Sequence, residues 1–254
     1  MTFRKAILLS GGLSMIAFLV ACGGSSTPQT IPPTIKITTT VGTPQSAIVG
    51  TEFTTAFSVT VTSNGSPASG VSVTFTAPSG EPNGTFATGG ATDTETTNSS
   101  GVATTLQAFT AGTEEGSYNV TATTSGAATP ATFALSNTAG PAADLAISSG
   151  NDQDPGFGGS YKPLVVQVTD SDGNGVSGVS ITFTITGNSA ASGSFTGGAT
   201  TETQSTDADG NATVSDLVAN PTEVGGQFTV TAAPTTVTLT PTSVTFIETV
   251  IIPK

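Results

Sequence analysis

An internal repeat of about 108 residues limits this chain to folds built from two similar units. Ser69–Thr76, with the sequence SGVSVTFT, is matched by Ser177–Thr184, SGVSITFT, and the GGAT of Gly89–Thr92 returns at the same offset. Further on, Tyr118–Ala122 corresponds to Phe228–Ala232 after a short insertion. A unit of this length is a domain of ordinary size, so the 254 residues accommodate two copies, each able to bury its own core.

The hydrophobic pattern within each copy is that of β-strands. In Val71–Thr76 apolar residues alternate with Ser and Thr, and Val179–Ile185 repeats the alternation. A period of two places the apolar side chains on one face of a strand. Short runs of this kind, separated by Gly, Asn, Pro and Ser, continue from Ile35 onward without a helical period. About seven such strands per copy predict an all-β fold of two tandem immunoglobulin-like β-sandwich domains.

The N-terminal segment has the composition of an export signal. Arg4 and Lys5 precede an apolar run, Ala6–Ala21, that is shorter than the ~20 residues a membrane-spanning helix needs. The run ends in Leu19–Cys22, LVAC, and Cys22 is the only cysteine. This sequence resembles the lipobox of bacterial lipoproteins, in which the cysteine thiol is acylated and the chain is cut just before it. The alternative is an ordinary cleaved signal followed by an incidental cysteine.

The lipobox resemblance and the repeat together define the expected domains. Residues 1–21 are a lipoprotein signal peptide, and residues 22–33, rich in Gly, Ser, Thr and Pro, are a flexible tether. The first Ig-like domain spans 34–140 and the second spans 141–254. Lipidation at Cys22 implies membrane anchoring, and the Gly that follows it implies an outer-membrane or cell-surface location within the cell envelope.

Four repeated segments resemble a known domain family. They are the SGVSITF of 177–183, the GSF and GGAT of 193–200, the TDADGNAT of 206–213 and the closing strand at 228–232. Together they resemble the first group of bacterial Ig-like domains, the type found in invasins and intimins. The resemblance implies a rigid spacer or adhesive module on a bacterial surface. The outer-membrane barrel and lectin-like tip of invasins and intimins are not recognised here, so their receptor binding is not expected to carry over.

Charge and composition argue against several function classes. The chain has 17 acidic and 5 basic residues, a net charge of -12, which repels phosphate backbones and disfavours nucleic acid as a partner. It has no His, which excludes His-based triads, Cys–His dyads and imidazole metal sites. A carboxylate pair of the glycosidase type remains open among the acids, but the absence of Trp disfavours a sugar platform. We therefore expect no enzyme activity.

Two acidic turns in the second copy suggest a calcium ligand set. In the first, Asp170, Asp172 and Asn174 alternate as in the first half of a calcium loop, although the twelfth position, Ile181, is not Glu. The alternative interpretation is a plain hairpin turn joining 164–168 to 179–183. The second turn contains Asp207 and Asp209, and the corresponding turns of the first copy carry no acid. Turn chemistry explains both segments, so calcium stays an open possibility and no other cofactor is expected.

Two functions follow from these observations. The first is a non-enzymatic cell-envelope lipoprotein whose tandem Ig-like domains act as a structural stalk or adhesion module, with the membrane as partner through the lipid and a protein or glycan as possible ligand. The second is a calcium- or carbohydrate-dependent binding module that uses the acidic loops of the second domain. The second domain holds 11 acids, against 6 in the first.

Overall fold

The computed structural model describes residues 32–106, 108–156, 159–187, 192–220 and 225–251. Within them the regular structure consists of twenty β-strands and one 3₁₀ helix. Residues Thr34–Lys254 form a unit separate from Met1–Pro33. The expected signal peptide 1–21, Cys22 and most of the tether 22–33 lie outside the described residues. The described part of the chain contains no helix with the length and hydropathy needed to cross a membrane.

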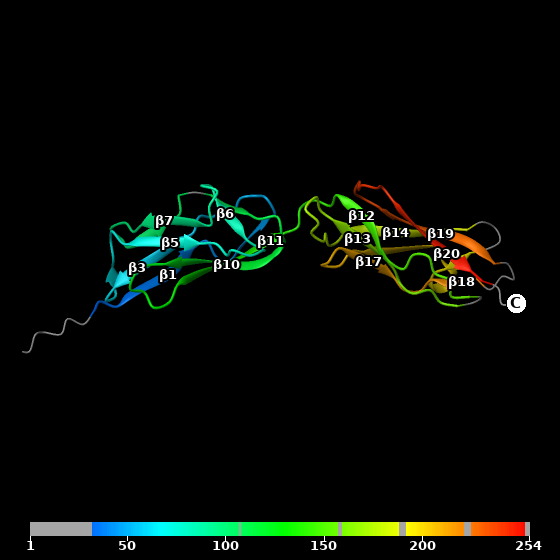
Figure 1. Cartoon of the computed structure of the whole chain (residues 1–254), viewed down its shortest axis with the longest axis horizontal. Helices are drawn as coiled ribbons and strands as arrows, with labels where there is room; N and C mark the ends of the chain where they lie inside the picture. The colour runs from blue at the N-terminus through cyan, green and yellow to red at the C-terminus, as the bar shows by residue number, and fades with distance from the viewer. Residues whose placement is uncertain (1–31, 107, 157–158, 188–191, 221–224, 252–254) are drawn as a thin grey trace, which may run out of the picture. The chain divides into compact units, whose positions relative to one another are not determined.

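The first sandwich consists of β1 to β11, coloured blue to green in Figure 1. One sheet has the order β1-β3-β4, with β8 also paired to β3, and the other has the order β2-β11-β10-β5-β7. Strands β6 and β9 form a small third sheet. All pairs are antiparallel except β2, which runs parallel to β11. The strands are β1 Ile35–Val41, β2 Gln45–Ile48, β3 Ser58–Ser63, β4 Ser66–Pro67, β5 Ser72–Thr76, β6 Gly84–Phe86, β7 Thr92–Thr96, β8 Val102–Thr104, β9 Phe109–Ala111, β10 Gly116–Thr123 and β11 Ala131–Thr138.

The second sandwich consists of β12 to β20 and the 3₁₀ helix η1. Its sheets have the orders β12-β13-β17, β16-β14-β19-β20 and β15-β18, and every pair is antiparallel. The elements are β12 Asp144–Ser149, β13 Leu164–Thr169, β14 Ser180–Thr186, β15 Gly193–Ser194, η1 Thr196–Gly198, β16 Thr201–Ser205, β17 Asn211–Val214, β18 Val218–Ala219, β19 Gly226–Pro234 and β20 Val244–Val250.

The two sandwiches are built alike, as the sequence repeat predicts. Strands β5, β7, β10 and β11 of the first correspond to β14, β16, β19 and β20 of the second. Val73 and Phe75 of β5 are fully buried, and so are Ile181 and Phe183 of β14, as the alternating pattern predicts. The all-β fold of two Ig-like sandwiches is therefore confirmed.

The turn from Asp170 to Gly175 folds back on the end of β13, through an antiparallel bridge between Thr169 and Gly175, but it does not join β13 to β14 as a hairpin. Strand β13 pairs with β12 and β17, whereas β14 lies in the opposite sheet between β16 and β19. The hairpin interpretation is wrong because alternation identifies a strand but not its partner. The chain crosses from one sheet to the other at this turn, as it does between β3 and β5 of the first sandwich.

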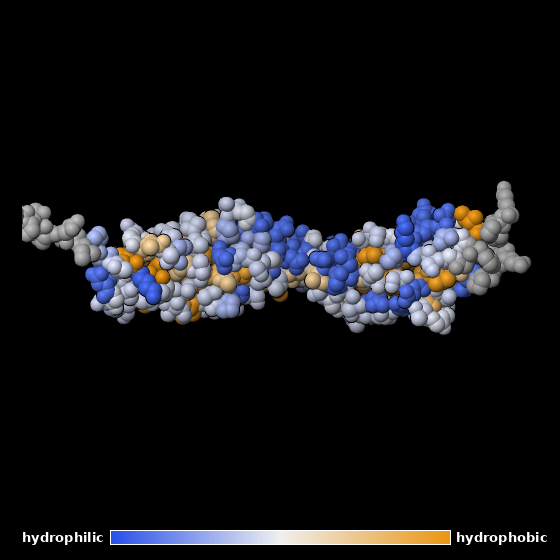
Figure 2. Space-filling model, turned by 90° about the horizontal axis from the view of Figure 1, so that it is seen from below, coloured by the Kyte–Doolittle hydropathy of each residue, from blue (hydrophilic) through white to orange (hydrophobic). Residues whose placement is uncertain are grey.

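Each sandwich has its own buried core. The core of the first is dominated by phenylalanine: the ring centroids of Phe57 and Phe133 are 4.9 Å apart, and those of Phe86 and Phe109 are 4.8 Å apart. The core of the second is mostly aliphatic and runs from Leu145 to Val250. On the face shown in Figure 2, pale residues of intermediate hydropathy predominate, with blue and orange ones scattered among them. Apolar burial and cross-strand pairing thus account for both sandwiches.

Candidate functional site

The Asp170 turn, the first of the suggested calcium ligand sets, is closed by its own backbone. Oδ1 of Asp170 accepts hydrogen bonds from the backbone N–H groups of Asp172 and Asn174, both at 2.9 Å. Oδ2 accepts from the backbone N–H of Gly140 at 2.7 Å and from Nδ2 of Asn174 at 2.9 Å. Both carboxylate oxygens of this 2%-exposed side chain are therefore bonded to protein donors.

Asn174 joins this turn to the first sandwich. Its Nδ2 donates to the carbonyl oxygen of Thr113 at 2.8 Å, and its Oδ1 accepts from the backbone N–H of Glu115 at 2.9 Å. Thr113 and Glu115 lie in the turn between β9 and β10. Asn174 is 7% exposed, so these bonds are shielded from water. We call this contact, made by Asp170, Asn174, Gly140, Thr113 and Glu115, the joint.

The electrostatics of the joint favour an ionised Asp170. Burial alone raises the pKa of this carboxyl, but the hydrogen bonds from Asn174, Gly140 and Asp172 outweigh burial and leave the pKa below its ordinary value. The negative charge is thus stabilised by N–H donors. Asp172 is exposed and its side chain is not part of the joint.

The second acidic turn repeats a neutral turn of the first sandwich. Oδ1 of Asp207 accepts from the backbone N–H groups of Asp209 and Asn211, at 3.0 and 2.8 Å. Oδ1 of Asn98 accepts from Ser100 and Val102 in the same pattern, at 2.9 and 3.1 Å. An Asx turn needs only a side-chain oxygen, and Asn and Asp both supply it. The acid at Asp207 therefore has a local structural role.

The five suggested metal ligands lie on two turns, whose backbones approach each other at Gly175 and Asp209. Asp170, Asp172 and Asn174 lie on one turn, whereas Asp207 and Asp209 lie on another, and in the described part of the chain no group of three or more His, Cys, Asp or Glu side chains is placed to hold a metal ion. Calcium at these turns stays a prediction. Cys22, the expected lipidation site, lies outside the described residues.

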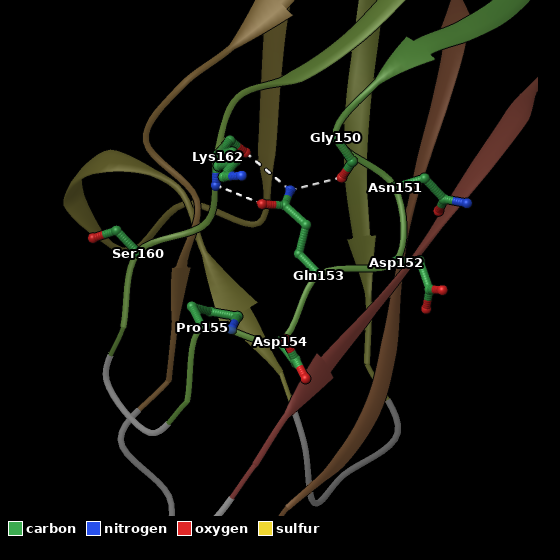
Figure 3. Close-up of a pocket in the computed structure, with 8 residues that line it drawn as sticks. All are labelled: Gly150, Asn151, Asp152, Gln153, Asp154, Pro155, Ser160 and Lys162. Atoms are coloured by element: carbon green, nitrogen blue, oxygen red, sulfur yellow. Dashed lines mark hydrogen bonds between the residues drawn. The ribbon is translucent and has the colours of Figure 1, made fainter.

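A glutamine clamp in each sandwich was missed at the level of sequence. Nε2 of Gln153 donates to the carbonyl oxygens of Gly150 and Lys162, at 2.7 and 3.1 Å, and its Oε1 accepts from the N–H of Lys162 at 2.7 Å (Figure 3). Gln45 bonds to Gly42 and Thr55 in the same way. The signal was present, because the spacing Gly-x-x-Gln occurs at 42–45 and 150–153, at the offset of the repeat.

The Gly150–Lys162 region also forms a surface hollow of about 550 Å³, lined by Gly150 to Pro155, Ser160 and Lys162 (Figure 3). Behind it lies Glu248 of β20, a carboxyl group with no exposed surface. Glu248 was not among the residues predicted from the sequence either. Its signal was an acid at an inward position of an otherwise apolar alternation, between Phe246 and Val250.

Several solved structures are similar to this chain. The chain is similar to the D0–D1 domain of intimin, with 20% identity over 85% of this chain and 96% of that chain and a TM-score of 0.30. It is also similar to the adhesin FdeC of Escherichia coli, with 16% identity over 87% of this chain and 64% of that chain and a TM-score of 0.38. It is similar as well to InvD of Yersinia pseudotuberculosis, with 16% identity over 87% of this chain and 58% of that chain and a TM-score of 0.46.

The likeness to these proteins concerns the fold alone. The chain spans less than two thirds of the FdeC and InvD structures. No protein-family model and no curated protein matches the sequence.

Proposed function

We propose that this chain is a non-enzymatic lipoprotein of the bacterial cell envelope, anchored through Cys22, whose two Ig-like sandwiches act as a structural stalk or adhesion module. The observation that carries the proposal is the joint. A protein that holds a binding surface away from a membrane needs its domains to move together, and Asn174 bonds the second sandwich to backbone groups of the first.

The chemistry of the joint suits a permanent mechanical connection. Three polar atoms of Asp170 and Asn174 are bonded to backbone groups at Gly140, Thr113 and Glu115. Each such bond contributes about 0.5 to 1.5 kcal/mol, and more where the acceptor is charged. Removing one partner leaves a buried amide or carbonyl unsatisfied, which costs about 1 to 3 kcal/mol. The joint therefore resists bending at the domain boundary.

Replacing Asn174 by Ala tests the mechanical role. We expect the variant to keep both sandwiches folded but to let them reorient independently, because the bonds to Thr113 and Glu115 are lost. ¹⁵N relaxation of the soluble protein measures this: the wild type gives one rotational correlation time, and N174A gives two shorter ones. The matched control is Asn98→Ala, because the Oδ1 atom of Asn98 accepts its hydrogen bonds from Ser100 and Val102 of its own turn. Unchanged relaxation in N174A contradicts the proposed joint.

Anchoring is tested by intact-mass spectrometry of the membrane-extracted protein. We expect a chain that begins at residue 22 and carries acyl groups, because the LVAC sequence resembles a lipobox and several acyl chains give a stable anchor. The Cys22→Ala variant is expected to lose the acyl mass and to leave the membrane fraction. If the wild-type chain is unmodified and cut elsewhere, the lipid anchor is contradicted, whereas the Ig-like fold is unaffected by that result.

The ligand of such a module is a protein or a glycan, and an outer-membrane or cell-surface location fits it. The calcium-dependent alternative has less support, because the oxygens of Asp170 are bonded to protein donors and Asp207 repeats the role of Asn98. An enzymatic function has less support too, because the chain has no His, the residue that most often acts as general acid or base in enzymes.

A further inference from the structure

Glu248 occupies a core position that an apolar side chain fills in the first sandwich. In the first sandwich, Leu135 of β11 lies opposite Tyr118 of β10, and it is 3% exposed. In the second sandwich, Glu248 of β20 lies opposite Phe228 of β19 and has no exposed surface. The second sandwich thus holds a carboxyl group at the equivalent core position.

The two oxygens of Glu248 are in different situations. Oε2 accepts a hydrogen bond from the backbone N–H of Gln153 at 3.1 Å. Oε1 is buried and has no hydrogen-bond partner within the described residues. A negative charge at Oε1 would therefore lack both water and a donor, whereas an uncharged carboxyl group avoids most of this penalty.

The segment Gly150–Gly156 lies over this carboxyl group and along β20. The N–H of Ile247 donates to Oδ1 of Asn151, the N–H of Asp152 donates to the carbonyl of Ile247, and the N–H of Thr249 donates to the carbonyl of Gln153. In the first sandwich the same edge is covered by β2, a regular parallel strand whose ladder runs over four residues. The cover of β20 is irregular by comparison, and Asp152 has a left-handed φ of 61°.

The charged groups around Glu248 come mainly from this segment. Asp152 and Asp154 lie on it, and Lys162 lies beyond it; all three side chains are exposed. Tyr161 donates its hydroxyl to the carbonyl of Thr249 at 3.0 Å. Strand β19 carries no titratable side chain, and β20 carries none besides Glu248. The pKa of Glu248 is raised to about 7: burial is the largest cause, the hydrogen bond from Gln153 acts in the opposite direction, and the like charge of Asp152 adds to the increase.

We propose that Glu248 is a proton-operated latch: its uncharged form keeps the Gly150–Gly156 segment closed over β20, and its ionisation releases the segment. Ionisation requires water or a donor at Oε1, and the irregular segment is the element through which water gains access with the least loss of sheet hydrogen bonds. Opening leaves the carbonyl of Ile247 and the N–H of Thr249 as free groups of a sheet edge. Such an edge is able to pair with an extended peptide.

The direction of the pH dependence follows from the folded-state pKa, which is higher than that of an unfolded Glu. The uncharged form of Glu248 stabilises the closed state fully below about pH 4.5, and this stabilisation is lost as the pH rises through about 7. Between pH 5.5 and 8 we expect the equilibrium constant for opening to increase about tenfold or more.

Two measurements on the full chain test the latch. ¹³C NMR of the Glu248 carboxyl is expected to show titration near neutral pH. Hydrogen exchange at the amides of Asp152, Gln153 and Thr249, corrected for intrinsic exchange rates, is expected to show protection that falls over the same range. Glu248→Gln keeps the acceptor for Gln153 without a charge, and Glu248→Leu introduces the residue of the equivalent position, Leu135. Both variants are expected to keep the segment protected at pH 8.

A Glu248 carboxyl that titrates near pH 4.5, or segment protection that stays constant in the wild type, would overturn the proposal. A protection loss of equal size in wild type and E248Q would also overturn it, because it would assign the pH dependence to other groups. The test does not depend on the joint or the lipid anchor, so its failure is distinguishable from failure of the proposed function.

Discussion

Replacing Phe57 by Ala is expected to destabilise the first sandwich by about 3 to 5 kcal/mol. Phe57 is 1% exposed and precedes β3. Its ring contacts three other aromatic rings, with centroids 4.9 Å from Phe133, 5.2 Å from Phe109 and 6.2 Å from Phe86. Truncation therefore removes apolar burial, leaves a cavity between the two sheets and deprives three rings of contacts.

Tyrosine fluorescence measures this loss in one sandwich at a time. The chain has no Trp and two Tyr, of which Tyr118 lies in the first sandwich and Tyr161 in the second. Denaturant unfolding in a Tyr161→Phe background therefore reports on the first sandwich alone. The control is Leu106→Ala, because Leu106 is 80% exposed and its truncation is expected to cost less than about 0.5 kcal/mol. Equal effects at the two positions would contradict the assignment of Phe57 to the core.

Replacing Gly101 by Ala is expected to lower the free energy of unfolding by about 2 to 4 kcal/mol. The effect arises from the backbone and involves no loss of apolar contacts. Gly101 has a left-handed φ of +74°, which is unfavourable for any residue with a Cβ. A Cβ here would also lie 2.5 Å from the carbonyl oxygen of Val61 and 3.0 Å from the backbone nitrogen of Ala68. Relief requires movement of backbone, since both atoms belong to the main chain.

Gly70 provides a matched control for Gly101. It has the same φ of +74°, but a Cβ there meets no described atom within 4 Å. Gly70→Ala is therefore expected to lower the free energy of unfolding by about 1 to 2 kcal/mol, which is the cost of the left-handed backbone conformation alone. The difference between the two variants, measured by the fluorescence of Tyr118, isolates the collision with Val61 and Ala68. No difference between them would show that the turn relaxes freely.

The local features of the fold were predictable because they depend on neighbouring residues. Alternation identified the buried faces of β5 and β14, and Val73, Phe75, Ile181 and Phe183 are buried accordingly. The repeat identified two similar sandwiches, and it also contained the Gly-x-x-Gln spacing of the clamps at Gln45 and Gln153. The clamps are recognisable in the sequence by this identical spacing and not by an apolar pattern.

The roles of the acidic residues depended on partners far along the chain. Asp170 and Asn174 suggest calcium when considered alone, but in the structure their polar atoms bond to groups at Gly140, Thr113 and Glu115. No periodicity or motif connects Asn174 with residues about 60 positions earlier. Only the approach of one sandwich to the other brings these groups within hydrogen-bond distance.

The all-β class, the duplication and the strand faces follow from patterns within a strand or between repeat copies. The pairing of the strands, the turn that forms the joint and the core position of Glu248, where Oε1 has no partner within the described residues, emerge only in the folded protein. Sheet pairing and burial are collective. A side chain acquires its desolvation and its hydrogen-bond partners from elements that are distant in sequence, and these contacts exist only when the sheets have assembled.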